Sequence, residues 1–247
     1  MKKILCMAVG LGLVLALAAC GAAPTAEPET TIPSYASEIY ILMRDVADTF
    51  NGGRFYLRGR TIVPEHDFSP AVDTPIVMAG DGSRSVLEQT LDWAQHDAEQ
   101  AEALQSTFGN TMRMLIERGG STTIFPERDA YFSFGNILGD EMYMMEFDPV
   151  GIDGLHIPFD IAYVHATYAG RTYLATTLPV DGGMSTFFFH NNQLRRMETV
   201  AFDGGLSIIE IDTLHRNPPE SLFSTAQMQS MPLNDVFMFM EVWGPMF

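Results

Sequence analysis

A stripe of apolar residues at helical spacing marks the segment from residue 34 to residue 51. Its members fall on one side of an ideal helix, and they are Tyr35, Ile39, Leu42, Met43, Val46 and Phe50. Such spacing is typical of an amphipathic helix that buries one face. Pro33–Ser34 suits the start of a helix, and Asn51–Gly53 suits its end. The pattern predicts one helix over residues 34–51 that packs against the rest of the protein.

Alternation with a period of two replaces the helical pattern after residue 53. In the stretch 54–63, Phe55, Leu57 and Val63 alternate with arginines, as in a strand whose two faces differ. Turns rich in glycine separate this run from several similar ones. The first half of the chain thereby predicts strands over residues 54–63, 74–79, 83–93, 109–118, 121–125 and 130–134.

The second half contains five further runs rich in β-branched and aromatic residues, over 161–168, 172–178, 184–190, 194–202 and 206–212. Short turns with Gly or Asn join them, which is typical of consecutive antiparallel hairpins. Two insertions interrupt the strands. Residues 94–105 consist of helix formers and predict a short helix or a helical loop, whereas 135–160 predicts a short helix followed by a lid-like loop. The tail after residue 219 either adds a helix or closes one mouth of the sheet.

The N-terminus has the three parts of a secretory signal. Lys2–Lys3 gives positive charge, residues 4–19 form an apolar run, and the run ends in the small residues of LAAC at Cys20. A cysteine directly after the cut resembles a bacterial lipobox, in which the thiol receives a diacylglyceryl group. The alternative is an uncleaved transmembrane helix, for which the run is slightly short. We expect removal of residues 1–19 and anchoring of Cys20, through acyl chains such as palmitate, on the extracytoplasmic face of a bacterial membrane.

Charge and composition narrow the function of the exported part. Residues 20–32 lack apolar periodicity and predict a flexible tether, which leaves residues 33–247 as a single domain. Both lysines leave with the signal, so 14 − 2 = 12 arginines face 31 acidic residues, a net charge of −19. This balance argues against a nucleic-acid partner. A chain without lysine also has no P-loop lysine and no Schiff-base lysine.

Candidate catalytic and metal-binding residues are scattered. No two histidines stand at the local spacings frequent in zinc sites, and the best remaining pair is His165 and His190 on neighbouring predicted hairpins. The loop acids Asp148, Asp153 and Asp160 lack the spacing of a calcium loop. The motifs GxSxG, GxGxxG and GxxxxGK[ST] are absent. We predict no enzyme, no catalytic residues, no metal and no cofactor, and keep a hydrolase with a dispersed site as a third hypothesis.

Four stretches of the strand pattern carry a family resemblance. They are TPIVMA at 74–79, MRMLIERG at 112–119, FFFHNNQL at 187–194 and IIEID at 208–212. With one N-terminal helix and the lipobox, they resemble the LolA-like superfamily of periplasmic lipoprotein carriers, their lipid-anchored acceptors and mycobacterial lipid-binding lipoproteins. The resemblance implies an α+β fold, a curved antiparallel half-barrel of about eleven strands wrapped around an N-terminal helix and short inserted helices. The soluble carriers lack a lipid anchor, and no family functional residue is carried over.

A surplus of apolar side chains is the positive functional signal. After loss of Met1 and Met7, 16 − 2 = 14 methionines remain, and methionine suits adaptable binding surfaces. Three consecutive phenylalanines put aromatic rings on both faces of one strand, although a strand buried on one face needs them at alternate positions. The surplus indicates either core packing or an apolar cavity open to an acyl chain. For the cavity, the candidate ligand-binding residues are Met112, Met114, Met184, Phe187, Phe188 and Phe189.

Two interpretations of the function follow. The leading one is a non-enzymatic, membrane-anchored lipoprotein that binds a lipid, lipopeptide or other amphiphile in the half-barrel cavity. The alternative is a protein-interaction or envelope-sensing module, with an envelope protein as partner and a core filled by its own side chains. Arg54, Arg58 and Arg60 share one strand face. They form either a basic patch for a lipid phosphate or an acidic partner, or cross-strand ion pairs.

Overall fold

The computed structural model describes six ranges of the chain, residues 37–65, 71–93, 96–117, 120–135, 157–180 and 182–243. The predicted signal peptide, the lipidated Cys20 and the tether at 20–32 lie outside these residues, and so does most of the insertion predicted at 135–160. Within the described ranges, none of the helices combines the length and the apolar character that crossing a membrane requires.

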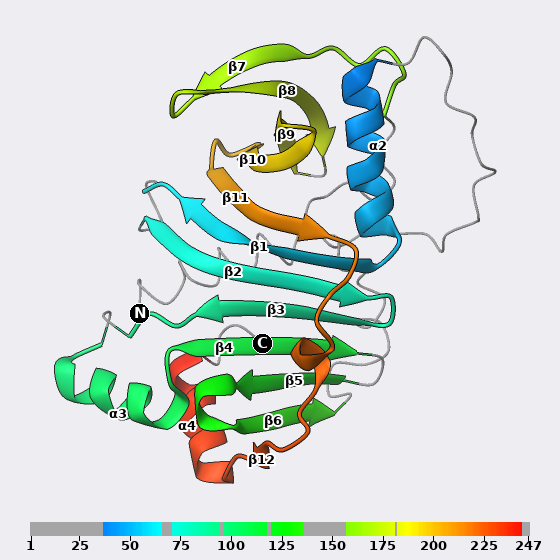
Figure 1. Ribbon diagram of the computed structural model, residues 1–247. Helices are drawn as coiled ribbons and strands as arrows, with labels where there is room; N and C mark the ends of the chain where they lie inside the picture. Colours follow the sequence, from blue (N-terminus) through cyan, green and yellow to red (C-terminus); the bar gives the residue numbers. More distant parts are fainter. Residues whose placement is uncertain are drawn as a thin grey trace.

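One sheet, with twelve strands in the described part of the chain, forms the body of the protein (Figure 1). The strands are β1 (Arg54–Val63), β2 (Val72–Asp81), β3 (Arg84–Thr90), β4 (Thr111–Glu117), β5 (Gly120–Phe125), β6 (Ala130–Gly135), β7 (Val164–Tyr168), β8 (Arg171–Val180), β9 (Gly183–His190), β10 (Gln193–Ala201), β11 (Leu206–His215) and β12 (Gln229–Ser230). The first eleven correspond to the strands predicted from alternation. β12 has two residues and is an addition to them.

Two antiparallel meanders make up this sheet. The strand order is β12-β6-β5-β4-β3-β2-β1-β11-β10-β9-β8-β7, so neighbours in the chain are mostly neighbours in space. The meanders meet where β1 pairs with β11, with Tyr56 opposite His215 and Ile62 opposite Ile208. β12 lies parallel to β6. The predicted α+β fold with a curved, mainly antiparallel open sheet is therefore confirmed (Figure 1).

The described helices are α2 (Glu38–Asn51), α3 (Ala98–Phe108) and α4 (Leu233–Trp243), with short 3-10 turns η1 (Pro126–Arg128) and η3 (Glu220–Phe223). The hydroxyl of Ser37 accepts the Tyr40 N–H at 3.3 Å. This cap explains why α2 begins at residue 38, after the predicted start. The Asp97 carboxylate caps α3 by accepting the Gln100 N–H at 2.9 Å. α3 therefore spans 98–108, which corrects the predicted range of 94–105.

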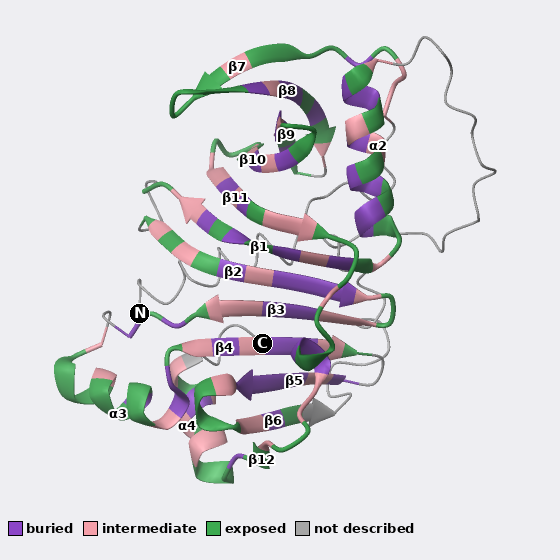
Figure 2. Ribbon diagram, in the orientation of Figure 1, coloured by how far each residue is buried: buried purple, intermediate pink, exposed green. Residues whose placement is uncertain are grey.

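The sheet has two faces because strand side chains alternate. We call the face that α2 packs on the α2 face; on β2 it carries Ile76 and Met78. α4, formed by the tail that the sequence left open, covers the same face farther along, where Phe239 contacts Phe125. The opposite face is crossed by residues 216–230, which we call the strap (Figures 1 and 2).

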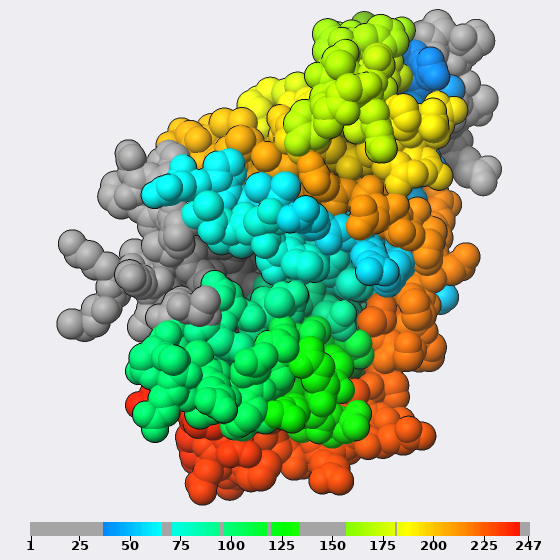
Figure 3. Space-filling view, turned by 60° about the vertical axis from the view of Figure 1, so that its left-hand side comes forward, coloured from blue at the N-terminus to red at the C-terminus, as the bar shows by residue number. Residues whose placement is uncertain are grey.

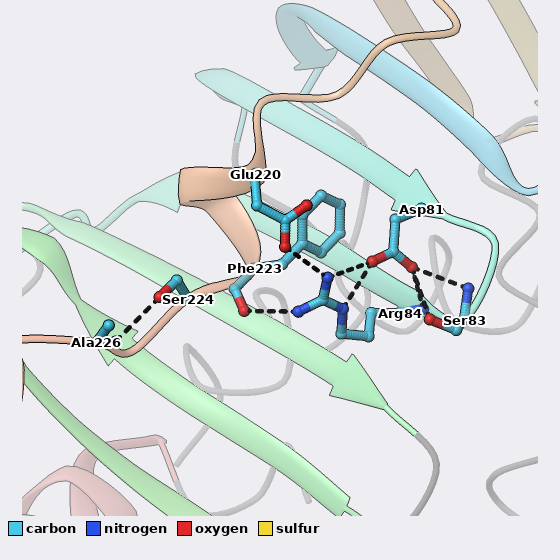
Figure 4. A network of polar contacts seen from close by, with 7 residues as sticks. All are labelled: Asp81, Ser83, Arg84, Glu220, Phe223, Ser224 and Ala226. Carbon is cyan, nitrogen blue, oxygen red and sulfur yellow. Dashed lines mark hydrogen bonds and ion pairs between the residues drawn. The ribbon is translucent and has the colours of Figure 1, made fainter.

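The strap is held by apolar contacts and by two arginines of the sheet. Its Leu222 and Phe223 pack on residues of β2 to β5 that point away from α2, namely Ala79, Val86, Leu115 and Ile124. Arg84 of β3 donates hydrogen bonds to the Phe223 carbonyl oxygen at 3.1 Å and to Glu220 at 2.9 Å (Figure 4). Arg113 of β4 donates to the Ser221 carbonyl oxygen at 3.3 Å. The strap is thus fixed across the strands of the first meander.

Asp81 orients the guanidinium that holds the strap. Its carboxylate accepts the Arg84 Nε–H at 2.7 Å and the backbone N–H groups of Ser83 and Arg84 at 2.9 and 2.8 Å (Figure 4). Burial raises the pKa of this carboxyl, but the hydrogen bonds from Ser83 and Arg84 outweigh burial and lower the pKa from 3.8 to about 2. Asp81 therefore stays ionised at every pH at which the protein is expected to work.

Candidate functional site

A layer of apolar side chains fills the interval between α2 and the sheet. The helix contributes six of them, each at most 7% exposed, namely Ile39, Tyr40, Met43, Val46, Ala47 and Phe50. From the sheet, Leu57 of β1 and Met78 of β2 are fully buried in the same cluster. Apolar burial stabilises by roughly 25 cal/mol per Å². Hydrophobic burial is therefore the main force that holds α2 on the sheet.

Four methionines belong to this layer, and we call them the methionine layer. Its members are Met43 of α2, Met78 of β2, Met114 of β4 and Met197 of β10. Leu87 lies opposite both Met78 and Met114 in the strand register. Because methionine is unbranched and has a polarizable sulfur, it fills irregular spaces and repacks at low cost. The layer beneath α2 can therefore change shape more readily than a layer of branched side chains.

Polar contacts tie α2 near its two ends. At the start, the Ser37 N–H donates to the Phe159 carbonyl oxygen at 3.0 Å, and the Tyr40 ring lies 4.8 Å from the Phe159 ring. Toward the end, Arg216 donates to Asp45 Oδ1 at 2.8 Å and to Thr49 Oγ1 at 3.1 Å. Between these ties, apolar side chains make the contact. The helix is thus attached by two small polar connections and a broad apolar face.

The half of the α2 face that α4 covers is packed differently. The Phe239 ring lies 5.4 Å from Phe108, 5.3 Å from Phe125 and 5.5 Å from Phe132, measured between ring centroids. Trp93 is buried beside them and donates its indole N–H to the Gly109 carbonyl oxygen at 2.8 Å. Aromatic rings in such contacts have few rotamers and preferred relative orientations. The deformable part of the α2 face is therefore the part beneath α2.

The six predicted ligand-binding residues do not share one surface. Met114, Phe187 and Phe189 lie in the layer beneath α2, whereas Met112 is 2% exposed in the cluster beneath α4. Phe188 points to the opposite face and lies perpendicular to the Tyr173 ring at 6.2 Å, and Met184 on that face is 43% exposed. Three of the six therefore lie beneath α2, Met114 within the methionine layer and the two phenylalanines beside it in the same cluster, and ligand binding by any of them stays a prediction.

One buried arginine, Arg196, fixes the hairpin of β7 and β8 on the face away from α2. Arg196 of β10 is 6% exposed, and it donates to Glu198 at 2.6 Å and to Glu210 at 2.7 Å. Its guanidinium carbon lies 4.0 Å from the centre of the Tyr168 ring, at the tip of the hairpin. In the space-filling view the hairpin lies over β9 and β10 (Figure 3). These contacts satisfy the arginine and give it a structural role.

The remaining polar candidates do not form a reaction centre in the described residues. His165 lies opposite Leu174 and shares the α2 side, whereas His190 contacts Tyr173 on the other side, so the two histidines point apart. The described ranges contain no group of three His, Cys, Asp or Glu side chains that could hold a metal ion. Arg60 binds Asp73 with bonds of 2.9 and 2.6 Å, so at this position the cross-strand interpretation of the basic patch holds.

Solved structures provide the similarities to known proteins. No family model and no curated protein matches the chain. The chain is similar to an uncharacterized conserved protein from Thermus thermophilus, with 5% identity, a TM-score of 0.38, and coverage of 78% of this chain and 99% of that one. It is also similar to a LolA superfamily protein from Nitrosomonas europaea, with 8% identity, a TM-score of 0.29, and coverage of 74% and 96%.

A third similar structure is that of an outer membrane lipoprotein-sorting protein domain from Vibrio parahaemolyticus, described as putative, with 8% identity, a TM-score of 0.29, and coverage of 76% and 96%. The open sheet is assigned from the strand order of the protein itself.

Three members of the methionine layer were not among the predicted site residues. Met43 lies in the apolar stripe that predicted the helix, so its burial was expected. Met78 and Met197 occupy inward positions of β2 and β10, next to Leu57 and Phe187 in register. Their strands were predicted, but the cross-strand neighbours were not. The alternation within each strand, combined with the register between paired strands, is the signal that would have identified these two methionines.

Proposed function

We propose that the protein is a membrane-anchored extracytoplasmic lipoprotein that binds the acyl chain of a lipid, lipopeptide or other amphiphile between α2 and the sheet. The lipobox-like sequence ending at Cys20 supports export and anchoring. The observation that carries the binding proposal is the methionine layer beneath a helix held by two small polar connections. The proposal assigns no enzymatic activity and no cofactor.

Entry of an acyl chain requires the methionine layer to repack or α2 to lift from the sheet. The acyl chain gains roughly 0.8 kcal/mol of binding free energy for each CH₂ group that leaves water. It also supplies new apolar contacts to the helix. The ion pair of Arg216 and Asp45 opposes lifting weakly, because its side chains are 53% and 76% exposed and such pairs contribute about 0–1 kcal/mol. A bound chain can therefore replace the contacts that α2 gives up.

Native mass spectrometry of the full chain tests anchoring and binding together. The protein is expressed with its own signal, extracted from membranes in a mild non-ionic detergent and activated by collisions. We expect a covalent mass that corresponds to loss of residues 1–19 and gain of acyl chains on Cys20, and an additional lipid mass that dissociates. A Cys20→Ser variant controls for the covalent part. An anchored protein that carries no dissociable lipid, before or after incubation with envelope lipids, contradicts the binding proposal.

A protein-interaction or envelope-sensing module is the second candidate. The observation that favours it is the near-complete burial of the layer beneath α2 by the protein's own side chains. In that case the core is permanently filled, and the exposed surface carries the function. Cross-linking in intact cells would then recover a specific envelope protein, and lipid binding would be absent in the mass spectra.

A further inference from the structure

A group of hydroxyl side chains borders the methionine layer on the α2 face, where Ile209 lies opposite both Thr61 and Met197. We call it the hydroxyl band, and it consists of Thr61 and Thr74 on β1 and β2 and of Ser207, Thr199 and Ser185 on β11, β10 and β9. In one row of the sheet, Thr61 lies opposite Thr74 on one side and Ile209 on the other. In the next row, Thr199 lies opposite Ser207 on one side and Ser185 on the other. Residues opposite one another on adjacent strands have Cβ atoms about 4.5–5.5 Å apart. The five hydroxyls therefore line neighbouring strands on one face.

On β1 the band lies at a distance from the apolar residue Leu57, which is opposite Met78 of the methionine layer. Thr61 stands four residues beyond Leu57 on β1, which is about 13 Å at the strand rise of 3.3 Å per residue. Gly59 separates them, and a Cβ atom there would lie 1.9 Å from the Glu210 carbonyl oxygen. Glycine is therefore required for the close pairing with β11. Along β1 it also leaves no side chain on the α2 face between Leu57 and Thr61.

The hydroxyl of Thr61 is the member that points to a ligand. Thr61 is 9% exposed, and its Oγ1 has no hydrogen-bond partner among the described residues. By contrast, Ser185 and Thr199 bond each other at 2.7 Å. A buried hydroxyl without a partner costs about 1–3 kcal/mol, and valine fits the same site without that cost. A hydrogen-bonding group that arrives with a ligand would satisfy this hydroxyl.

The charge around the band restricts the chemistry of that partner. The α2-face positions of β1, β2 and β9 carry apolar residues, glycine, serine or threonine and no charged side chain. Arg58 and Arg60 of β1 point to the opposite face, where Arg60 is bound to Asp73. Among these described strand residues, a phosphate placed at the band would meet hydroxyls without a cation. An uncharged group with carbonyl or hydroxyl oxygens would be fully satisfied there.

We propose that the hydroxyl band binds the uncharged, hydrogen-bonding end of a neutral acyl lipid, with Thr61 as the residue that contacts its ester, amide or hydroxyl group. This assignment rests on the proposed function, because it places the acyl chain of the same ligand in the methionine layer. It makes the preferred ligand class neutral glycerides and comparable esters or amides, and it disfavours anionic phospholipids.

Two lipids with identical acyl chains test the assignment on the delipidated full chain. The probes are dioleoylglycerol and dioleoylphosphatidylglycerol, each titrated by native mass spectrometry in mild detergent. We expect dioleoylglycerol to bind at least about ten-fold more tightly, because the phosphate finds no cation at the band. Equal or tighter binding of the anionic lipid overturns the assignment, while the proposed function stands. Failure of both lipids to bind overturns both.

Substitution of Thr61 by valine tests the residue itself. Thr61→Val removes a hydrogen bond worth about 1 kcal/mol, so dioleoylglycerol binding should weaken about five-fold. The lipid-free variant should melt about 2–4 °C higher for each kcal/mol of relieved desolvation. Thr186→Val on β9 is the matched control, because Thr186 points to the other face and bonds Thr177 at 2.9 Å. Unchanged binding in Thr61→Val, or equal loss in both variants, contradicts the role of Thr61.

Discussion

Replacement of Asp81 by asparagine should loosen the strap and remove an acid-sensitive part of the protein's stability. The Asp81 carboxylate accepts the Arg84 Nε–H at 2.7 Å, and the same guanidinium holds Glu220 and Phe223 of the strap. Asparagine has nearly the same shape but no charge. Arg84 then loses one of its two carboxylate partners and its fixed orientation toward the strap.

The pKa of Asp81 sets the size of this effect. It falls from 3.8 to about 2 in the folded protein, and each unit corresponds to about 1.4 kcal/mol. The upper limit is therefore about 2–3 kcal/mol, which solvent screening at this turn reduces to about 1–2 kcal/mol. Because the folded pKa lies below the unfolded one, this stability is complete well above pH 3.8. It is lost as the pH falls from 3.8 toward 2.

Urea unfolding at several pH values measures the effect. At pH 7, Asp81→Asn should lower the free energy of unfolding by about 1–2 kcal/mol, and the difference from the unmodified protein should shrink toward pH 2. Asp73→Asn is the control, because the Arg60–Asp73 pair is 53% and 52% exposed and should contribute about 0–1 kcal/mol. If Asp81→Asn and the unmodified protein differ by a constant amount from pH 7 to pH 2, the reasoning is refuted.

Three further substitutions test other parts of the fold. Phe239→Ala empties the centre of the aromatic cluster beneath α4 and should lower the free energy of unfolding by about 3–5 kcal/mol in urea titrations. Arg196→Met removes the guanidinium that Glu198 and Glu210 share. Because these carboxylates are partly exposed, the same assay should show a loss of about 2–3 kcal/mol, below the range for fully buried pairs. Arg216→Met should speed hydrogen exchange in α2 and change the global stability by less than about 1 kcal/mol.

Local patterns predicted the strands because each strand carries its own alternation. The run from 54 to 63 has the same bounds as β1, since Gly53 precedes it and alternation defines both faces. The pairing of β1 with β11 lies outside such reasoning, because it joins residues about 150 positions apart through a shared register. The tail was ambiguous for another reason. Its Phe-Met alternation at 237–240 suits a strand, and contacts of Phe239 with distant rings select the helix.

The apolar character of the candidate site could be predicted from the sequence, but only some of its residues could. Methionine and phenylalanine surplus pointed to an adaptable apolar interior, and Met114, Phe187 and Phe189 do lie beneath α2. Phe188 and Met184 point to the other face, which follows from the period of two. The hydroxyl band was not found, because its five residues come from five strands and share no motif in the sequence. Knowledge of the register was needed to place them together.

Photo-cross-linking with a diazirine-bearing fatty acid tests the central claim most directly, because it locates an acyl chain on the protein. The full chain is incubated with the probe, irradiated and mapped by peptide mass spectrometry. The account predicts labels on α2 and on the strand segments that carry Met78, Met114 and Met197, with competition by unlabelled dioleoylglycerol. Labels confined to α4, to the strap or to exposed Phe202, or the absence of competed labels, would contradict acyl-chain binding beneath α2.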